Sequence, residues 1–207
     1  MLRSDRDYYF TIEASFRAPE LKVKGSRFIA DIFPASSKQE CDEHLERIRK
    51  EFYDATHHCY AYRLGIDGEY IRAADDGEPA GTAGKPILLA LSSKDLTNSL
   101  LVVTRYYGGT NLGTGGLSRA YFEAAQLAIN GSVMKTVYLT DSFTIILAYE
   151  DVGAIERLLA ASHAILRAHD YGEKVTIKVD IRKSLSEKFR SEIAEHFYGG
   201  RVVLLEE

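Results

Sequence analysis

The sequence predicts an α+β fold in two domains, residues 1–131 and 132–207. Three observations lead to this prediction. Segments with the two-residue period of strands and segments with the helical period both occur along the whole chain. The last part of the chain, over about 70 residues, gives the order β-α-β-β-α-β. A short linker near Gly131 and Ser132 precedes that part, and the two parts show no internal repeat.

The first half of the N-terminal part predicts strands, a helix and a hairpin. Two or three strands are expected in "YYFTIEASFRAPELKVKGSRFIADIFPA", with breaks near Pro19 and Gly25. A helix follows in "SSKQECDEHLERIRKEFYDA", because Ser37 and Glu40 form a capping box and apolar residues then recur at helical spacing. The segment "HCYAYRLGIDGEYIRAA" predicts a hairpin that turns at "GIDG".

The second half of this part predicts a loop, two helices and a buried strand. The loop is "DDGEPAGTAGKP", and its Pro86 suits the first turn of a short apolar helix, "PILLALSS". The run "SLLVVTRYY" is typical of a buried strand. A glycine-rich stretch comes next, and we expect a helix from Leu117 to Ile129.

The C-terminal part predicts a ferredoxin-like domain. One long strand is expected in "KTVYLTDSFTIILAYE", a helix with Asp151 at its N-cap in "DVGAIERLLAAS", and a hairpin in "AILRAHDYGEKVTIKVDI". Ser184 and Glu187 predict a second capping box in "SLSEKFRSEIAEHF", a helix that Gly199-Gly200 would end. The segment "RVVLLEE" predicts a last strand. This order is that of the split βαβ arrangement.

The charge balance argues against a protein that coats nucleic acid through a basic domain. The net charge is −4, and residues 1–131 hold 16 Lys/Arg against 18 Asp/Glu. Residues 132–207 hold 10 Lys/Arg against 12 Asp/Glu. A nucleic-acid site must therefore be a local patch.

The same composition favours a cytoplasmic protein with no membrane partner. The opening "MLRSDRDYYFTIEAS" mixes charges into its first residues and is not a signal peptide. No apolar run approaches the roughly 18 residues that a membrane span needs. Cys41 and Cys59 are the only cysteines, which is too few for a disulfide framework.

The loop "DDGEPAGTAGKP" carries three carboxylates, Asp75, Asp76 and Glu78. It is not a P-loop, because Pro86 follows Lys85 where that motif requires Ser or Thr. The carboxylates could hold a hard cation through oxygen ligands. The preferred interpretation is structural, since a carboxylate before a helix satisfies free backbone N–H groups. No further residue nearby has ligand spacing, so no metal is predicted.

The segment "THHCY" places His57 and Cys59 on one face of a strand and His58 on the other. Two such ligands could begin a zinc site, or a cysteine–histidine pair could act as a nucleophile. No second Cys/His pair completes a zinc site, and neighbouring strand positions rarely align an imidazole with a thiol. A structural role is preferred, with one histidine hydrogen-bonded inside or at the mouth of a cleft.

The stretch "TRYYGGTNLGTGGLSRAYFEAA" predicts an anion site. It does not fit the dinucleotide pattern G-x-G-x-x-G, but a strand, a glycine-rich turn and a helix together expose backbone N–H groups at a helix N-terminus. The alternative is that the glycines only permit tight strand–helix packing. The predicted anion-binding or RNA-binding residues are Lys85, Arg105, Gly108, Gly109, Gly113, Gly115, Gly116, Ser118 and Arg119.

Tyrosines surround this stretch. Tyr106, Tyr107 and Tyr121 flank the glycines, and Tyr60 and Tyr62 share a face of the preceding hairpin. Exposed tyrosines beside arginines can stack on single-stranded bases. Tyrosines are also common at the edges of cores, so this support for RNA binding is weak.

Four segments together resemble the signature blocks of the IMPACT/YigZ family. They are "KGSRFIA", "ATHHCYAY", "DDGEPAGTAGKPIL" and "VVTRYYGGTNLGTGGLSRAY", in that family's order, and they cover about residues 24–125. The rest of the chain is similar to the smaller C-terminal domain of bacterial members. One departure is Gly25, which separates Lys24 from Ser26 where many relatives have Lys directly before Ser.

The resemblance implies a fold and a field of activity. The N-terminal domain should be similar to a domain shared by a small-subunit ribosomal protein, RNase PH and elongation factor G, a sandwich rich in βαβ units. Eukaryotic relatives regulate translation by competing for the activator of an initiation-factor kinase. They use an additional N-terminal domain that this sequence does not show, so that partner is not carried over. The family has no established catalytic residues.

The leading hypothesis is a non-enzymatic regulatory protein linked to translation or stress response. It would bind RNA or a ribosome-associated partner through the glycine-rich loops, without a cofactor. The rival is an enzyme acting on a phosphorylated or nucleotide-like small molecule, and a third class is a protein-interaction module with an exposed apolar patch. The expected cleft is lined by His57, His58, Asp75, Asp76, Glu78, Tyr106 and Tyr107, together with the cations named above. The sequence does not determine the oligomeric state.

Overall fold

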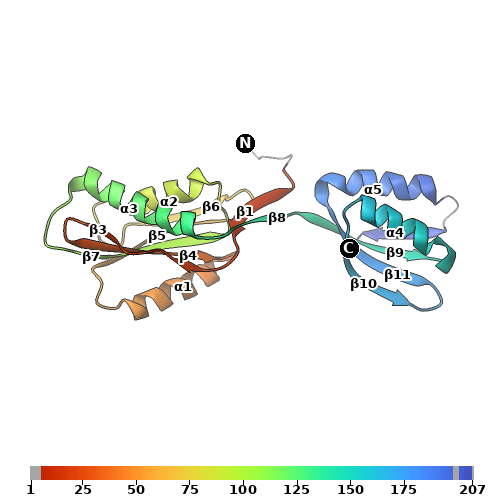
Figure 1. Ribbon diagram of the computed structural model, residues 1–207, viewed down its shortest axis with the longest axis horizontal. Helices are drawn as coiled ribbons and strands as arrows, with labels where there is room; N and C mark the ends of the chain where they lie inside the picture. The colour runs from red at the N-terminus through yellow and green to blue at the C-terminus, as the bar shows by residue number, and fades with distance from the viewer. Residues whose placement is uncertain (1–5, 198–200, 207) are drawn as a thin grey trace. The chain divides into compact units, whose positions relative to one another are not determined.

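The computed structural model describes residues 6–197 and 201–206. Within these residues the chain forms two compact units, one of residues 9–137 and one of residues 138–206 with residues 6–8 (Figure 1). Both units mix helices and strands, so the predicted α+β class is confirmed. No helix in the described ranges is long and apolar enough to cross a membrane.

The N-terminal unit is a six-stranded sheet with helices on both faces (Figure 1). The strand order is β2-β4-β7-β5-β6, with β3 also paired to β4, and these neighbouring strands are all antiparallel. Because β7 pairs with both β4 and β5, the unit β4-α1-β5 is a βαβ unit with β7 inserted. The elements are β2 (Phe16–Arg17), β3 (Leu21–Val23), β4 (Ser26–Pro34), α1 (Lys38–Glu51), β5 (His57–Leu64), β6 (Tyr70–Ala74), α2 (Gly84–Ser93), β7 (Ser99–Tyr106) and α3 (Gly113–Gly131).

The central strand β7 is buried on both faces. Leu101 and Val103 belong to the core under α2 and α3, whereas Leu100 and Val102 belong to the core under α1. This explains why its sequence is a continuous apolar run rather than an alternating one. Arg105 continues the face of Leu101 and Val103, which carries it toward α2 and α3.

Helix α1 begins as its sequence predicts. The Ser37 hydroxyl accepts a hydrogen bond from the backbone N–H of Glu40 (3.2 Å). The Glu40 carboxylate in turn accepts from the N–H of Ser36 (2.8 Å), one residue before the expected partner. The capping box is confirmed with this shift.

The long strand expected after α3 is wrong, because the chain changes sheets at Leu139. β8 (Met134–Tyr138) pairs with β1 (Tyr8–Ile12), whereas β9 (Thr140–Leu147) enters the sheet of the C-terminal unit. The alternation in the sequence is continuous across both strands and does not show which partner each half meets. The units divide between residues 137 and 138, later than the expected division, which coincides with the end of α3.

The C-terminal unit has the predicted ferredoxin-like order. Its four strands are antiparallel in the order β10-β11-β9-β12, and α4 and α5 cover one face (Figure 1). The core lies between that face and side chains such as Ile155, Phe189 and Ile193. The further elements are a short 3₁₀ helix (Tyr149–Asp151), α4 (Val152–Ala161), β10 (Ile165–Tyr171), β11 (Val175–Arg182), α5 (Lys183–His196) and β12 (Val202–Glu206).

Two capping predictions in this unit need correction. Asp151 stands at the N-cap of α4 but makes no side-chain capping bond, because its carboxylate accepts from Arg201 instead (2.9 Å). Helix α5 begins at Lys183, so Ser184 lies inside its first turn, and the predicted capping box with Glu187 does not form. The predicted stop at Gly199-Gly200 lies outside the described residues.

Candidate functional site

The two glycine-rich segments, residues 75–86 and 107–116, lie side by side at the ends of α2 and α3. Together they line two separate clefts. One, here called the His57 cleft, has a volume of about 480 Å³ and is lined by Thr56, His57, Glu78, Pro79, Arg105, Tyr107, Asn111, Leu112, Gly113, Thr114 and Leu117. The other, here called the Lys85 cleft, has a volume of about 570 Å³ and is lined by Gly81, Lys85, Pro86, Leu89, Ser118, Arg119, Phe122, Glu123 and Gln126.

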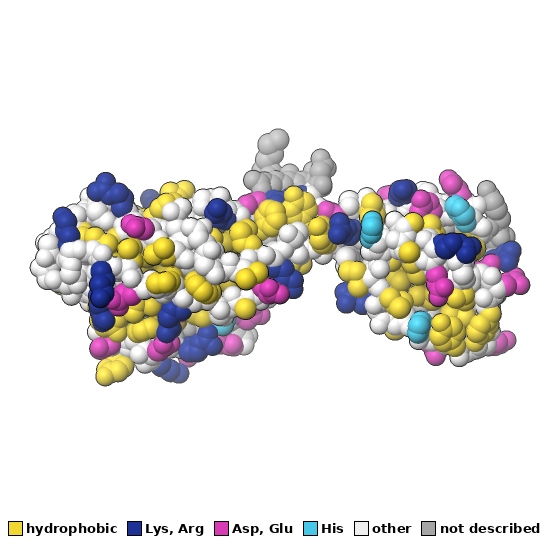
Figure 2. Space-filling model, viewed as in Figure 1, with side chains coloured by type: hydrophobic (Ala, Val, Ile, Leu, Met, Phe, Trp, Pro, Cys, Tyr) yellow, Lys and Arg dark blue, Asp and Glu magenta, His cyan; other side chains and the backbone are white. Residues whose placement is uncertain are grey.

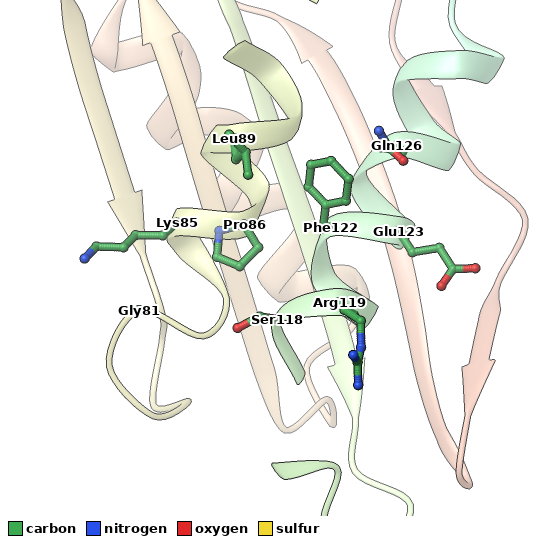
Figure 3. A pocket seen from close by; sticks show the side chains of 9 residues that line it. All are labelled: Gly81, Lys85, Pro86, Leu89, Ser118, Arg119, Phe122, Glu123 and Gln126. Atoms are coloured by element: carbon green, nitrogen blue, oxygen red, sulfur yellow. The ribbon is translucent and has the colours of Figure 1, made fainter. Parts of the chain in front are cut away.

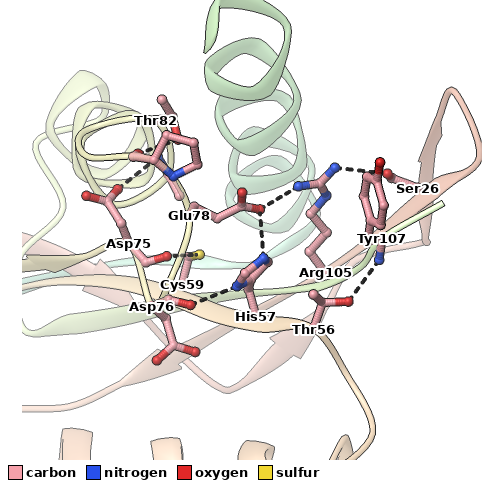
Figure 4. A network of polar contacts seen from close by, with 12 residues as sticks. Ser26, Thr56, His57, Cys59, Asp75, Asp76, Glu78, Thr82, Arg105 and Tyr107 are labelled. Atoms are coloured by element: carbon pink, nitrogen blue, oxygen red, sulfur yellow. Dashed lines mark hydrogen bonds and ion pairs between the residues drawn. The ribbon is translucent and has the colours of Figure 1, made fainter. Parts of the chain in front are cut away.

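A buried ion pair forms the base of the His57 cleft (Figure 4). Nη1 of Arg105 donates to Oε1 of Glu78 (2.7 Å), and the two side chains are only 5% and 3% exposed. The hydroxyl of Tyr121 donates to the same oxygen (2.7 Å). Nη2 of Arg105 donates to the hydroxyl of Ser26 (3.1 Å), and the guanidinium lies 5.3 Å from the ring centre of Tyr107. Arg105 is therefore held as a structural cation.

His57 stands beside this pair because of strand register. His57 of β5 is the direct partner of Arg105 of β7, so both side chains point to the same face of the sheet. Nδ1 of His57 lies 2.8 Å from the carbonyl oxygen of Asp76, and Nε2 lies 3.8 Å from Oε1 of Glu78. A carbonyl can only accept, so Nδ1 carries the proton in the neutral ring and Nε2 is an acceptor.

His58 and Cys59 are structural. Nε2 of His58 contacts the carbonyl of Phe52 (3.1 Å) on the α1 side of the sheet, and burial lowers its pKa. The Cys59 thiol donates to the carbonyl of Asp75 (2.9 Å), and burial raises its pKa to about 12. A thiol that is protonated at neutral pH is a poor nucleophile. His58 does not line the expected cleft, because strand alternation turns it away.

The carboxylates of Asp75 and Asp76 are occupied by the protein itself. Asp75 accepts from the backbone N–H groups of Gly81 (2.7 Å), Ala83 (3.0 Å) and Gly84 (2.8 Å), which satisfies the start of α2. Asp76 accepts from Arg49 (3.0 Å) and from the N–H of His58 (2.7 Å). Neither lines the His57 cleft, which corrects their predicted place there. The described part of the chain holds no group of three or more metal-ligating side chains.

Replacing Asp75 by Asn is expected to lower the free energy of unfolding at pH 7 by about 2 kcal/mol, since hydrogen bonds to a charged acceptor are lost. Burial alone would raise the pKa of Asp75, but the three backbone N–H groups outweigh it and lower the pKa. A lowered folded-state pKa gives stability that is complete above the unfolded pKa and lost as pH falls through the folded one. Urea unfolding should show the wild-type advantage unchanged from pH 7 to pH 5 and shrinking below about pH 4.

The matched control for this prediction is Asp67→Asn, an exposed carboxylate that receives no hydrogen bond from the described residues. Its free energy of unfolding should follow that of the wild type at every pH. An Asp75→Asn difference that is as large at pH 3 as at pH 7 would show that the charge on Asp75 does not stabilise the helix start.

Helix α3 begins four residues earlier than predicted, at Gly113 instead of Leu117. It has no side-chain capping bond and no acidic residue in its first turn. A Cβ added at Gly115 would meet no atom within 4 Å, so the first turn opens outward. The free N–H groups of this turn border the His57 cleft.

The sequence leaves two interpretations of the glycines open, an anion site and tight packing of the backbone. A Cβ at Gly108 would lie 1.9 Å from the backbone carbon of Gly25, so this glycine serves tight packing of two turns. Gly109 and Gly113 have φ of +79° and +71°, and a Cβ at either would meet no neighbour, so they serve the shape of the loop. Gly115, in the first turn of α3, likewise has open space beside it and no positive φ.

The Lys85 cleft combines an apolar floor with two cations (Figure 3). Pro86 and Leu89 of α2 face Phe122 of α3, and Leu89 is 61% exposed. Lys85 and Arg119 form no ion pair with a described residue. The expectation that Lys85, Arg105 and Arg119 share one cleft is wrong, because Arg105 belongs to the His57 cleft and is bound by Glu78.

The five tyrosines predicted to stack on bases differ in whether a ligand can reach them. Tyr107 lines the His57 cleft and is 46% exposed, whereas Tyr106 donates to Asp54 (2.8 Å) and does not line it. Tyr121 is buried, and burial raises its pKa. Tyr60 and Tyr62 are buried in the core under α1. Tyr107 is thus the one predicted stacking residue that the described chain leaves open to a ligand.

Sequence reasoning missed four polar residues of the His57 cleft and its support. Ser26 accepts from Arg105 and from the N–H of Gly108 (3.2 Å), and Thr56 accepts from the N–H of Tyr107 (3.0 Å). Asn111 and Thr114 line the cleft beside the start of α3. The available signal was the position of Ser26 within "KGSRFIA" and of Thr56 directly before the histidine pair.

Both units match known families. Residues 24–129 match the Impact N-terminal domain, and residues 145–199 match a domain of unknown function, DUF1949. A solved structure described as a hypothetical protein is 31% identical, with a TM-score of 0.66, and covers 97% of each chain.

Two curated relatives match along most of the chain. IMPACT family member YvyE of Bacillus subtilis (strain 168) is 34% identical over 193 residues, which are 90% of this chain and 86% of the relative. IMPACT family member YigZ of Escherichia coli (strain K12) is 33% identical over 186 residues, 89% and 91% of the two chains. The resemblance of the glycine-rich blocks is confirmed, and the chain belongs to the IMPACT family.

Proposed function

We propose that this protein is a non-enzymatic regulator linked to translation or stress response that binds RNA on its glycine-rich face. The observation that carries the proposal is the start of α3, whose first turn has free N–H groups, no acidic residue and open space above Gly115. Such a turn favours a phosphate group. The proposed link to translation comes from the chain's membership of the IMPACT family, because the resemblance to that family implies a role in translation.

Two cations and one aromatic ring support the same proposal. Lys85 and Arg119 lie on the Lys85 cleft, on one side of the first turn of α3, and form no ion pair among the described residues. Tyr107 lies on the other side with 46% of its surface exposed. Charges of both signs are interspersed over the visible face of each unit (Figure 2), so this is a local site rather than a basic surface. A few phosphate contacts and one stacked base fit that scale.

Replacing Lys85 and Arg119 together by Ala is expected to weaken binding of a single-stranded RNA by about tenfold at 100 mM salt, with the same factor for every sequence. The slope of log K against log salt should become shallower by roughly 1.4, since two phosphate contacts are lost at about 0.7 each. Fluorescence anisotropy with labelled oligonucleotides from 50 to 300 mM salt measures both quantities.

Lys50→Ala is the matched control, an exposed lysine on α1 at the opposite face of the sheet. It should leave affinity and slope unchanged. Wild-type binding that is absent, or insensitive to salt, would contradict the proposal. RNA should also be recovered intact, and cleavage products would contradict the non-enzymatic character.

The second candidate is an enzyme acting on a phosphorylated or nucleotide-like small molecule. It is favoured by one observation, the meeting of His57 and Glu78 in a cleft of small-ligand size. Thermal unfolding in the presence of mononucleotides separates the two proposals. A rise in the melting temperature with a mononucleotide, without RNA binding, would favour the enzyme, since a ligand of the native state stabilises it by mass action.

A further inference from the structure

The His57 cleft has two walls of opposite hydrogen-bonding character. The start of α3 contributes free backbone N–H donors and the hydroxyl of Thr114. The facing wall contributes acceptors, the carboxylate of Glu78 and the ring of His57. A ligand that fits both walls must carry acceptors at one end and a donor at the other.

The acceptor on Glu78 is an oxygen that the protein does not use. Arg105 and Tyr121 both donate to Oε1, and Oε2 accepts from none of the described residues (Figure 4). The Glu78 side chain is 3% exposed, and the part that can be reached includes Oε2, which is not a fully buried atom. A ligand in the cleft can therefore donate a hydrogen bond to this oxygen.

The acceptor on His57 follows from its tautomer. Nδ1 donates to the carbonyl of Asp76, so Nε2 of the neutral ring offers a lone pair. At 3.8 Å, Nε2 is too far from Oε1 of Glu78 for a hydrogen bond. Two acceptors on one wall thus stand without a donor between them.

The cleft does not repel an anion despite its carboxylate. The charge of Glu78 is balanced by Arg105 at 2.7 Å, so the pair carries no net charge. No further acidic side chain lines the His57 cleft. A phosphate group at the start of α3 therefore meets the helix N-terminus without a net negative charge opposite.

We infer that the His57 cleft binds one ribonucleotide of the RNA and reads its 2′-hydroxyl group. The phosphate accepts from the first turn of α3, and the 2′-hydroxyl donates to Oε2 of Glu78, with His57 beside it on the same wall. Ribose and phosphate are joined in one unit, which suits a cleft of about 480 Å³. The 2′-hydroxyl is the group by which a protein tells RNA from DNA. This inference rests on the proposed RNA binding and names the feature of the RNA that is read.

The test compares wild-type binding to three oligonucleotides of one sequence, with ribose, 2′-fluoro-2′-deoxyribose and 2′-deoxyribose. Fluorine is small and cannot donate, and this sugar keeps the pucker of ribose, so the pair isolates the donated hydrogen bond. The ribo-oligonucleotide should bind about tenfold more tightly than either of the others, the factor that corresponds to one hydrogen bond to a charged acceptor.

Glu78→Gln tests the residue. Arg105 and Tyr121 are both donors at Oε1, so the amide oxygen should face them and the NH₂ group should replace Oε2. The preference for ribose over 2′-fluoro should then fall to about onefold to twofold. The ratio between the two oligonucleotides is the readout, because the loss of the Glu78 charge changes the affinity for both of them alike. The control is Glu43→Gln, which changes an exposed glutamate of α1 and should keep the wild-type preference.

The outcomes separate the two proposals. Equal wild-type affinity for the three oligonucleotides, with clear salt dependence, would overturn the reading of the 2′-hydroxyl and leave RNA binding in place. No binding to any of them would overturn the proposed function itself. The wild-type comparison stands without a variant, so it decides even where Glu78→Gln folds poorly.

Discussion

Arg105→Met is expected to lower the free energy of unfolding by about 3–5 kcal/mol, the largest stability effect that the structure indicates. Arg105 is the charged partner of Glu78, and the two side chains are only 5% and 3% exposed. Methionine fills a similar space but leaves the carboxylate without a counter-charge. It also removes the donor to Ser26, which joins β4 to the glycine-rich turn. Urea unfolding followed by circular dichroism measures the loss.

A second change identifies the cause. The double variant Arg105→Met with Glu78→Gln removes both charges and keeps an oxygen for the hydroxyl of Tyr121. It should recover about half of the lost stability, because the unpaired buried charge is gone. If the double variant is less stable than Arg105→Met alone, the loss comes from packing of the arginine between Phe28 and Tyr107 and not from the unpaired buried charge of Glu78.

Most of the fold could be predicted from signals between residues that are close in the sequence. Ser37 and Glu40 are four residues or fewer from the groups they cap, so the start of α1 could be predicted. The C-terminal unit could be predicted because its strands and helices alternate along the chain in the order of their motif. The break at Leu139 could not, since it depends on β8 pairing with a strand more than a hundred residues earlier.

The role of Arg105 could not be predicted from sequence for the same reason. Beside a glycine-rich turn, an arginine indicates a phosphate contact. Glu78, which neutralises it, lies in another loop and reaches it only because β5 and β7 are neighbours. The cations that stay without an ion pair in the described chain, Lys85 and Arg119, lie on the other cleft.

The early start of α3 could not be predicted because glycine is a poor helix former. Three glycines occupy its first turn, and local propensity places the start at Leu117. In the structure the helix begins at Gly113, and its body packs on the sheet through Tyr121 and Ala124. The extension places free N–H groups beside the His57 cleft, which is the feature that the proposed function needs.

Gly115→Glu is therefore expected to change stability and binding in opposite directions. A side chain there meets no neighbour within 4 Å and replaces glycine in a helix, which stabilises by roughly 0.5–1 kcal/mol. A carboxylate in the first turn adds about 0.3–1 kcal/mol through the helix dipole. The same carboxylate occupies the place proposed for the phosphate, so RNA binding should fall by roughly thirtyfold, equivalent to about 2 kcal/mol at a helix N-terminus.

Gly115→Gln separates charge from shape in this prediction. It has a side chain of the same length and nearly the same helix propensity, so it should keep the propensity part of the stabilisation and lose RNA affinity only a few-fold. Melting temperatures and anisotropy titrations on the three proteins give both readouts. If Gly115→Glu gains stability and still binds RNA as the wild type does, the phosphate does not lie at the start of α3. The two cations of the Lys85 cleft would then have to bind the RNA without the backbone N–H groups of that first turn.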